Sequence, residues 1–308
     1  MPFFFSRRAY NASKKRFSNA VSKPMRYVSV IDTAPGPDGW SGQMRKRDDW
    51  LAEVQAAGGD RDVLIYVHGF NTSQHDMLTR AILIENGLRK HGFRGALVSF
   101  DWPSDGSVIA YDHDKEDAKK VATSFVKEGL WPIMKMSPRP KVHVLAHSMG
   151  AYLIGRALAP FGDGSGPGSK PWRMDQIMFA SADLHRNTLA KGASNQLLIS
   201  HRSKRLTNYY SREDKVLKLS SNIVHGTKAR AGRKGIPAQI AKDHVDVSCT
   251  AQYRRDAEPI DPGMTYSHRW WFENDGFYED MALTLAGTPK TAMTTRFTTT
   301  GTDYALVT

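Results

Sequence analysis

The chain has 308 residues, of which 40% are hydrophobic and 24% are charged, and its formal net charge is +12. This composition is ordinary for a globular protein, and the length suits one large domain or two small ones. The single cysteine, Cys249, excludes an internal disulfide bond and a zinc site built from cysteines. No apolar run approaches the roughly 18 residues that a transmembrane helix needs, so we expect a cytoplasmic protein without a membrane span.

Basic side chains gather in two segments, residues 7–26 and residues 228–234. We expect residues 1–26 to form a mobile basic arm and the Thr-rich residues 289–308 to form a mobile tail, on either side of a domain at 27–288. Positive charge of this size favours contact with nucleic acid or with an anionic surface. Because no nucleic-acid-binding motif accompanies it, we expect weak contact with an anionic surface and no binding of nucleic acid.

Short apolar runs alternate with segments of helical periodicity along most of the chain. The runs predict strands at residues 63–67, 96–100, 142–146, 176–180, 206–210 and 244–247. The periodic segments predict helices at residues 75–90, 114–130, 151–159, 184–198, 213–220 and 274–286. Such alternation is typical of the α/β class, with a mostly parallel, doubly wound sheet and helices on both faces. The strands are almost wholly apolar, as expected where both faces are buried.

The sequence Ala146-His147-Ser148-Met149-Gly150 joins one of these strands to the helix that follows it. A serine on a sharp turn between a strand and a helix is the pattern of a nucleophile elbow. Small residues two before and two after the serine let the strand and helix approach closely. We therefore predict that Ser148 is a catalytic nucleophile. The alternative is an ordinary turn or N-cap serine.

A serine nucleophile needs a base, and in this topology the base follows the nucleophile and the acid along the chain. His268 is the best candidate, because it comes after the last predicted strand and just before the closing helix. Other histidines in the second half of the chain are weaker candidates: His185, His201, His225 and His244.

The acid is expected on a loop after a late strand, where it can orient the imidazole. Asp214 follows the strand at 206–210 and is favoured, with Glu213 beside it. Asp183 follows the preceding strand and is the second choice, while Asp246 lies within the last strand. A helix-terminal acid that interacts with the helix dipole remains an alternative role for Asp214.

An oxyanion hole requires backbone N–H groups aimed at the developing negative charge. We expect one from Met149, and a second from Phe70 in the sequence His68-Gly69-Phe70-Asn71, which follows an early strand. Gly69 would allow close backbone approach there. We also expect His68, Asn71, His147, Asp101 and Trp102 to line or support the pocket, and residues 221–241 to provide a small cap over it.

Several of these segments together resemble the DUF900 family of bacterial α/β hydrolases. The resemblance lies in Leu64-Ile-Tyr-Val-His-Gly-Phe-Asn71, Ser99-Phe-Asp-Trp-Pro-Ser104 and Leu145-Ala-His-Ser-Met-Gly150, and it covers roughly residues 60–285. Tyr210-Ser-Arg-Glu-Asp214 and His268, with Phe-Glu-Asn beyond it, are similar to late motifs of the family. The resemblance implies an α/β-hydrolase fold and the triad Ser148, Asp214 and His268.

These features predict a serine hydrolase that cleaves a small carboxylic ester through an acyl-enzyme intermediate. Such chemistry needs neither a cofactor nor a metal. A thioesterase or a peptidase would use the same three side chains, and a non-catalytic binding protein could retain the same scaffold.

Overall fold

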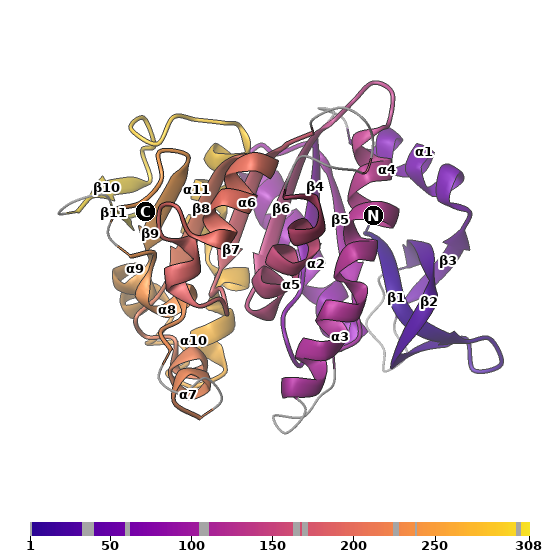
Figure 1. Cartoon of the computed structure of the whole chain (residues 1–308), viewed down its shortest axis with the longest axis horizontal. Coiled ribbons are helices and arrows are strands. Elements are labelled where there is room, and N and C mark those ends of the chain that lie inside the picture. Colours follow the sequence, from indigo (N-terminus) through magenta and orange to yellow (C-terminus); the bar gives the residue numbers. More distant parts are fainter. Residues whose placement is uncertain are drawn as a thin grey trace.

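The strands of the protein form a single sheet across the middle of the molecule (Figure 1). This computed structural model describes residues 2–32, 40–58, 62–104, 111–162, 167, 172–223, 228–237, 239–299 and 303–308. The sheet has 11 strands in this part of the chain, in the order β10-β11-β9-β8-β7-β6-β4-β5-β1-β2-β3. The strands are β1 (Phe3–Asn11), β2 (Arg16–Asp32), β3 (Ser41–Arg45), β4 (Asp62–Val67), β5 (Ala96–Asp101), β6 (Lys141–His147), β7 (Met174–Ala180), β8 (Ser203–Tyr210), β9 (His244–Ser248), β10 (Arg296–Thr298) and β11 (Asp303–Leu306).

Across the middle of the sheet, from β11 to β1 in the spatial order just given, every pair of neighbouring strands is parallel. At the two ends, β2, β3 and β10 add antiparallel pairs. The helices are α1 (Arg47–Ala57), α2 (Gln74–Lys90), α3 (Tyr111–Ser124), α4 (Trp131–Met134), α5 (Met149–Leu158), α6 (Ser194–Arg202), α7 (Lys215–Ile223), α8 (Ala231–Lys234), α9 (Thr250–Asp256), α10 (Tyr266–Arg269) and α11 (Asp275–Leu285). This is the mostly parallel, doubly wound α/β arrangement that the sequence predicts. None of the described helices is both long and apolar enough to span a membrane.

Both faces of the sheet are buried, which explains the apolar strands. In β4, Val63 and Ile65 belong to a core with α1, α3, α4, α5 and α6, whereas Leu64 and Tyr66 belong to a core with α2, α9, α10 and α11. Because successive side chains of a strand point to opposite faces, neither face can carry exposed polar groups here.

One predicted helix differs from the structure in its length and start. The segment predicted as a helix at 184–198 contains a 3-10 turn at Arg186–Leu189 and then α6, which runs to Arg202. Gly192 lies between the two with a φ of +82°, and this left-handed conformation interrupts the helical path.

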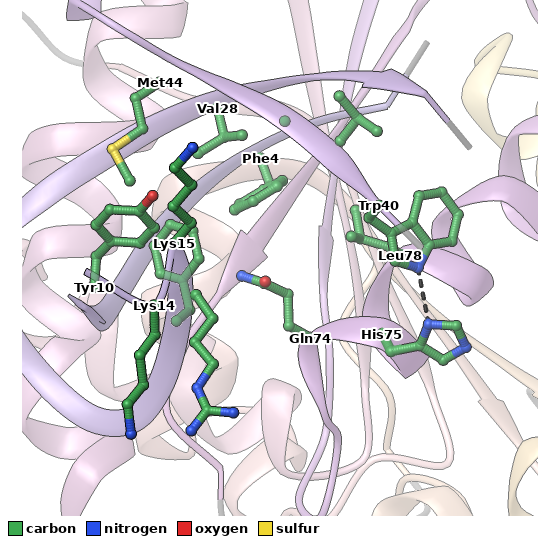
Figure 2. A pocket seen from close by; sticks show the side chains of 14 residues that line it. Phe4, Tyr10, Lys14, Lys15, Val28, Trp40, Met44, Gln74, His75 and Leu78 are labelled. Carbon is green, nitrogen blue, oxygen red and sulfur yellow. Dashed lines mark hydrogen bonds between the residues drawn. The ribbon is translucent and has the colours of Figure 1, made fainter. Parts of the chain in front are cut away.

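The N-terminal segment is part of the sheet, so the prediction of a mobile basic arm at residues 1–26 is wrong. Phe3, Phe4 and Phe5 are at most 3% exposed. In β1 they pair in parallel with β5 on one side and antiparallel with β2 on the other. Burial of three phenylalanines is worth about 5–9 kcal/mol. This is enough to keep the segment ordered even though the neighbouring cations favour solvent. The turn of this β1–β2 hairpin forms one wall of a surface groove (Figure 2).

The C-terminal segment also contradicts the prediction of a mobile tail at 289–308. β11 pairs in parallel with β9, and β10 closes the edge as an antiparallel neighbour. Leu306 is 1% exposed and belongs to the core on the α2 and α11 face. The two strands read Arg-Phe-Thr and Asp-Tyr-Ala-Leu, and it is their aromatic and apolar residues, rather than the threonines that suggested a tail, that suit an edge strand.

The described part of residues 221–241 does not form the expected cap. Gly232 donates its N–H to the carbonyl of Ala182, and its own carbonyl accepts from the N–H of Ser211, at 2.9 and 3.0 Å. A Cβ on Gly232 would lie 2.1 Å from the Ala182 nitrogen. The segment is therefore inserted between the loops that follow β7 and β8. Residues 224–227, which include the candidate His225, and residue 238 lie outside the described residues.

Candidate active site

Ser148 occupies a strained turn between β6 and α5, as the elbow pattern predicts. Its φ and ψ are 56° and −122°, a conformation that residues with a side chain rarely adopt. Gly150 packs against the end of β4, where a Cβ would lie 2.5 Å from the Val67 carbonyl oxygen. Only glycine fits at this position, so the turn is held by close contact with the neighbouring strand.

His268 is hydrogen-bonded to Asp214. The distance from His268 Nδ1 to Asp214 Oδ2 is 2.7 Å, and the Asp214 side chain is fully buried. Its carboxylate also accepts from Ser181 Oγ at 2.8 Å and from the Leu217 N–H at 2.8 Å. These contacts hold Nδ1 of the imidazole on the acid and leave Nε2 as the remaining ring nitrogen.

Two residues that sequence reasoning missed orient this acid. Ser181 directly follows β7 with a φ of 50°, and its hydroxyl bridges Asp214 and the indole of Trp271. The Trp271 Nε1 donates to Ser181 Oγ at 2.9 Å. The only signal in the sequence was the position of Ser181 directly after a predicted strand, which is shared by many unrelated residues.

His147 supports the histidine from the other side. Its Nε2 lies 2.9 Å from the carbonyl oxygen of His268, and the two rings are 4.7 Å apart. Burial, together with the nearby His268, lowers the pKa of His147 well below its usual range. The ring is therefore neutral, with a proton on Nε2 that it donates to the carbonyl. The sequence predicted His147 as a supporting residue, and its contact is with the backbone of α10.

Ser148 and His268 line the same cavity, which has a volume of about 250 Å³. In the described part of the chain no hydrogen bond joins the Ser148 side chain to His268. Catalytic hydrogen bonds are often long in ligand-free proteins and tighten when substrate binds. The wall is largely apolar and aromatic, with some charged and polar groups; it includes Phe70, Asn71, Arg80, Tyr111, Asp183, Val216, Leu217, Leu219, Met264 and Arg269. The helix α7 thus provides the wall that residues 221–241 were expected to provide.

The loop after β4 packs directly against the elbow. A Cβ on Gly69 would lie 2.7 Å from the Ser148 Cβ and 3.1 Å from the His147 carbonyl oxygen. Phe70 follows it and lines the cavity, and Asn71 adopts a left-handed φ of 50°. Among the described residues, no partner accepts from the N–H groups of Phe70 and Met149. Both N–H groups expected to form the oxyanion hole are therefore free to bind a ligand.

His68 and Trp102 stabilise this loop through hydrogen bonds and a stacking contact. The Trp102 N–H donates to His68 Nε2 at 3.2 Å, while His68 Nδ1 lies 2.9 Å from the Gly69 carbonyl oxygen. This pattern requires a neutral imidazole with its proton on Nδ1. Burial lowers the pKa of His68, in agreement. The indole of Trp102 stacks on His68 at 5.2 Å and donates to the His68 carbonyl. Both residues brace the loop and neither lines the cavity.

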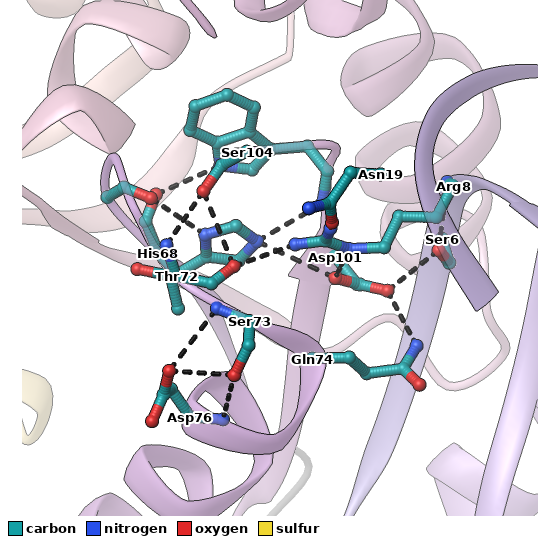
Figure 3. Close-up of polar contacts among 12 residues, drawn as sticks. Ser6, Arg8, Asn19, His68, Thr72, Ser73, Gln74, Asp76, Asp101 and Ser104 are labelled. Carbon is teal, nitrogen blue, oxygen red and sulfur yellow. Dashed lines mark hydrogen bonds and ion pairs between the residues drawn. The ribbon is translucent and has the colours of Figure 1, made fainter. Parts of the chain in front are cut away.

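Asp101 anchors a buried polar network that connects this loop to the N-terminal strand (Figure 3). The Arg8 Nε lies 2.6 Å from Asp101 Oδ1, and the Arg8 Nη2 donates to the Thr72 carbonyl at 2.8 Å. Ser6 and Gln74 donate to the other Asp101 oxygen at 2.8 and 2.9 Å. Burial raises the pKa of Asp101, but Arg8 and the hydrogen bonds outweigh it, so the pKa lies below its usual range. Asp101 is therefore a bracing residue.

The other acids considered for the triad have different partners. Asp183 accepts from the Tyr111 hydroxyl at 2.7 Å and forms an ion pair with Arg230 at 3.1 Å. Glu213 pairs with Arg254 at the surface. Asp246 accepts from the Ile236 N–H, and burial raises its pKa. The contact with His268 Nδ1 that a triad acid must make is the one made by Asp214.

The weaker histidine candidates lie away from the cavity in the described structure. His185 precedes a 3-10 turn, His201 contacts the Gly162 carbonyl, and His244 begins β9. None of them lines the cavity that holds Ser148. The described residues also contain no group of three or more histidine, cysteine or acidic side chains that could hold a metal ion.

Comparison with known proteins assigns the family. Residues 44–245 match the model of the DUF900 family, described as α/β hydrolases of unknown function. The chain belongs to this family. It is similar to the uncharacterized protein alr1448 of Nostoc sp. strain PCC 7120, with 29% identity over a region that covers 30% of each protein. The matched region thus spans less than a third of that relative.

Solved structures resemble this DUF900 protein only weakly. A hyperthermophilic esterase from Pyrobaculum calidifontis has 12% identity and a TM-score of 0.36, covering 83% of this chain and 86% of the esterase. Phospholipase PlaB from Legionella pneumophila has 9% identity and a TM-score of 0.38, covering 80% and 67%. At scores this low, the two likenesses carry no argument about activity.

Proposed function

We propose that this α/β hydrolase cleaves carboxylic esters with Ser148 as its nucleophile. The observation that carries the proposal is the convergence of three features on one cavity. They are a serine in a strained elbow, a histidine on the same cavity wall, and a buried carboxylate 2.7 Å from that histidine. Such a constellation activates a serine in unrelated hydrolases because the acid fixes the imidazole tautomer and stabilises its charged form.

In the proposed reaction, His268 Nε2 takes the proton of the Ser148 hydroxyl while Oγ attacks the ester carbonyl. The N–H groups of Phe70 and Met149 stabilise the oxyanion of the tetrahedral intermediate, a contribution of about 3–4 kcal/mol per donor in a well-studied protease. His268 then protonates the departing alcohol, and the acyl group remains on Ser148. Water, deprotonated by His268, attacks this acyl-enzyme and releases the carboxylic acid.

The apolar wall of the cavity favours the acyl group as the part of the substrate that binds inside it. Val216, Leu217 and Leu219 from α7 and Met264 supply apolar surface, while the volume of about 250 Å³ is near the lower end for small-molecule sites. A short, uncharged acyl chain suits these dimensions best. We therefore propose short-chain esters over long-chain esters as substrates.

The test uses p-nitrophenyl esters of two to twelve acyl carbons, with a matching thioester and anilide, on the intact protein and on Ser148→Ala. We expect ester cleavage that falls with chain length and disappears in Ser148→Ala. A fluorophosphonate probe should label the protein at Ser148. Ser200→Ala is the matched control and should retain both properties, because Ser200 lies on α6 outside the cavity. Faster thioester or anilide cleavage would reassign the substrate class, and labelling that survives Ser148→Ala would refute the nucleophile.

A further inference from the structure

A second cavity lies between the β1–β2 hairpin, β3 and the start of α2 (Figure 2). Its volume of about 770 Å³ is within the range of small-molecule sites. None of its described lining residues also lines the cavity that holds Ser148. This groove is therefore separate from the proposed active site, and the ester chemistry does not account for it.

The hairpin turn brings three cations to one side of the groove. Lys14, Lys15 and Arg16 are consecutive in the sequence, are exposed, and line the cavity. None of the three forms an ion pair with a described residue. No acidic side chain is among the described lining residues. Asp101 lies close by through its bond to Gln74, but Arg8 already pairs with this carboxylate.

The rest of the groove is apolar and aromatic. Phe17 packs on Phe4 and Tyr10, with ring centroids 5.9 and 5.0 Å apart. Trp40 lies at the opposite side from the lysines, where its Nε1 donates to His75 Nδ1 at 2.8 Å (Figure 2). Val28, Val30, Met44 and Leu78 complete the lining. Phe4, Val28, Val30 and Leu78 are at most 3% exposed, so Tyr10, Phe17, Trp40 and Met44 supply the accessible apolar surface of the groove.

We propose that this groove binds a lipid with a phosphate headgroup. The phosphate contacts Lys14, Lys15 and Arg16, and the alkyl chain lies along Tyr10 and Phe17 towards Trp40. Charge complementarity supports the headgroup, since three cations without an acidic partner among the described residues line a cavity that has no described acid. The apolar wall supports the chain. A nucleic acid would need cations spaced along the whole groove, whereas here they occupy one turn.

Binding is measured with dodecyl phosphate, below its micelle concentration, through the fluorescence of Trp40. Trp40→Phe identifies the part of the signal that comes from this indole. We expect dodecyl phosphate to bind at least about tenfold more tightly than inorganic phosphate or dodecyl maltoside, each of which supplies half of the ligand. Equal affinity for inorganic phosphate would overturn the lipid assignment, and so would equal affinity for the maltoside.

Charge reversal distinguishes a site from general attraction. The triple variant Lys14→Glu, Lys15→Glu and Arg16→Glu should lose at least about tenfold in affinity, with an unchanged circular dichroism spectrum because the turn is exposed. A matched variant changes the net charge equally at three exposed lysines outside the groove: Lys127→Glu, Lys191→Glu and Lys242→Glu. Equal losses in the two variants would overturn the site.

Two further measurements address the apolar wall and the source of the lipid. Met44→Glu places a charge at a residue that is already 37% exposed and should also weaken dodecyl phosphate binding. Phosphatidylglycerol vesicles with brominated chains should quench Trp40, which would identify a membrane as the source. Binding of dodecyl phosphate without quenching would assign a free lipid to the same groove. Absence of both signals would refute the proposal, whatever the outcome of the hydrolysis assays.

Discussion

Replacing Arg8 tests how much its buried ion pair with Asp101, which joins the N-terminal strand to β5, stabilises the fold. In Arg8→Met, the Asp101 carboxylate loses its cation in a fully buried environment, since the Arg8 and Asp101 side chains are 2% and 0% exposed. Removing one partner of a buried ion pair costs about 3–5 kcal/mol. Asp101 keeps hydrogen bonds from Ser6 and Gln74, so we expect a loss near the lower limit, about 3 kcal/mol.

This loss should depend on pH, with a sign that follows from the burial of Asp101. In the intact protein the pKa of Asp101 is depressed, so its contribution to stability is present at neutral pH and is lost as acid protonates it. Without Arg8, burial dominates and raises this pKa above the unfolded value of about 4. The variant is then penalised as the pH rises above about 4, and its deficit should be smaller at pH 4.5 than at pH 7.

The assay is urea unfolding followed by tryptophan fluorescence at both pH values. Arg47→Met is the matched control, because its ion pair with Asp48 is 55% and 80% exposed and should contribute less than about 1 kcal/mol. Asp101→Asn in the Arg8→Met background should recover about 1 kcal/mol or more, since it removes the unpaired charge. A loss no larger than that of the control, or no recovery on Asp101→Asn, would refute the reasoning.

The remaining predictions concern the proposed active site and the ends of the fold. Asp214→Asn should lower kcat by roughly 10⁴-fold, as in a comparable triad, while Asp183→Asn should be milder; steady-state kinetics on a short ester would show the ranking, and its reversal would reassign the acid. Gly69→Ala forces a Cβ within 2.7 Å of the Ser148 Cβ and should reduce kcat about 100-fold with little change in secondary structure; normal turnover would argue that the loop does not position the oxyanion site. The His147 ring should stay neutral and show no NMR titration between pH 5 and 8, because burial lowers its pKa. Its protonation in the unfolded chain should then cost up to about 1.4 kcal/mol of stability per pH unit below about 6.5, and a mid-range titration of the ring would contradict this. Deleting residues 2–11 should leave no soluble folded protein, since about 5–9 kcal/mol of phenylalanine burial is comparable to the whole stability of a domain.

Local periodicity and chain order were sufficient for much of this protein. The apolar runs predicted six strands of the sheet, because a parallel strand covered on both faces must be apolar along its whole length. The elbow at Ser148 was predictable as well. A serine between a strand and a helix is also compatible with an ordinary turn, and the later acid and histidine in the expected chain order favoured the nucleophile. The position of His268 near the end of the chain followed from the order of elements in this topology.

The strands at the two ends could not be predicted in this way. In β1, Ser6 separates three phenylalanines from Arg7 and Arg8, so the composition of this segment indicates an arm unless partners for those cations are known. The partners are distant in sequence: Asp101 is 93 residues from Arg8, and Glu128 is 121 residues from Arg7. Local sequence carries no record of such pairs, because they exist only once the sheet has formed.

The choice among acids also required the tertiary structure. Asp183 and Asp214 each follow a strand at the same edge of the sheet, so sequence position alone could not separate them. Contacts from Ser181 and Leu217 hold Asp214 against His268, whereas Arg230 and Tyr111 hold Asp183. Sequence thus determined which residue types reach this edge of the sheet, through periodicity and topology. The folded packing decided which of them touch, because hydrogen-bond contacts depend on side-chain positions to within an ångström or less.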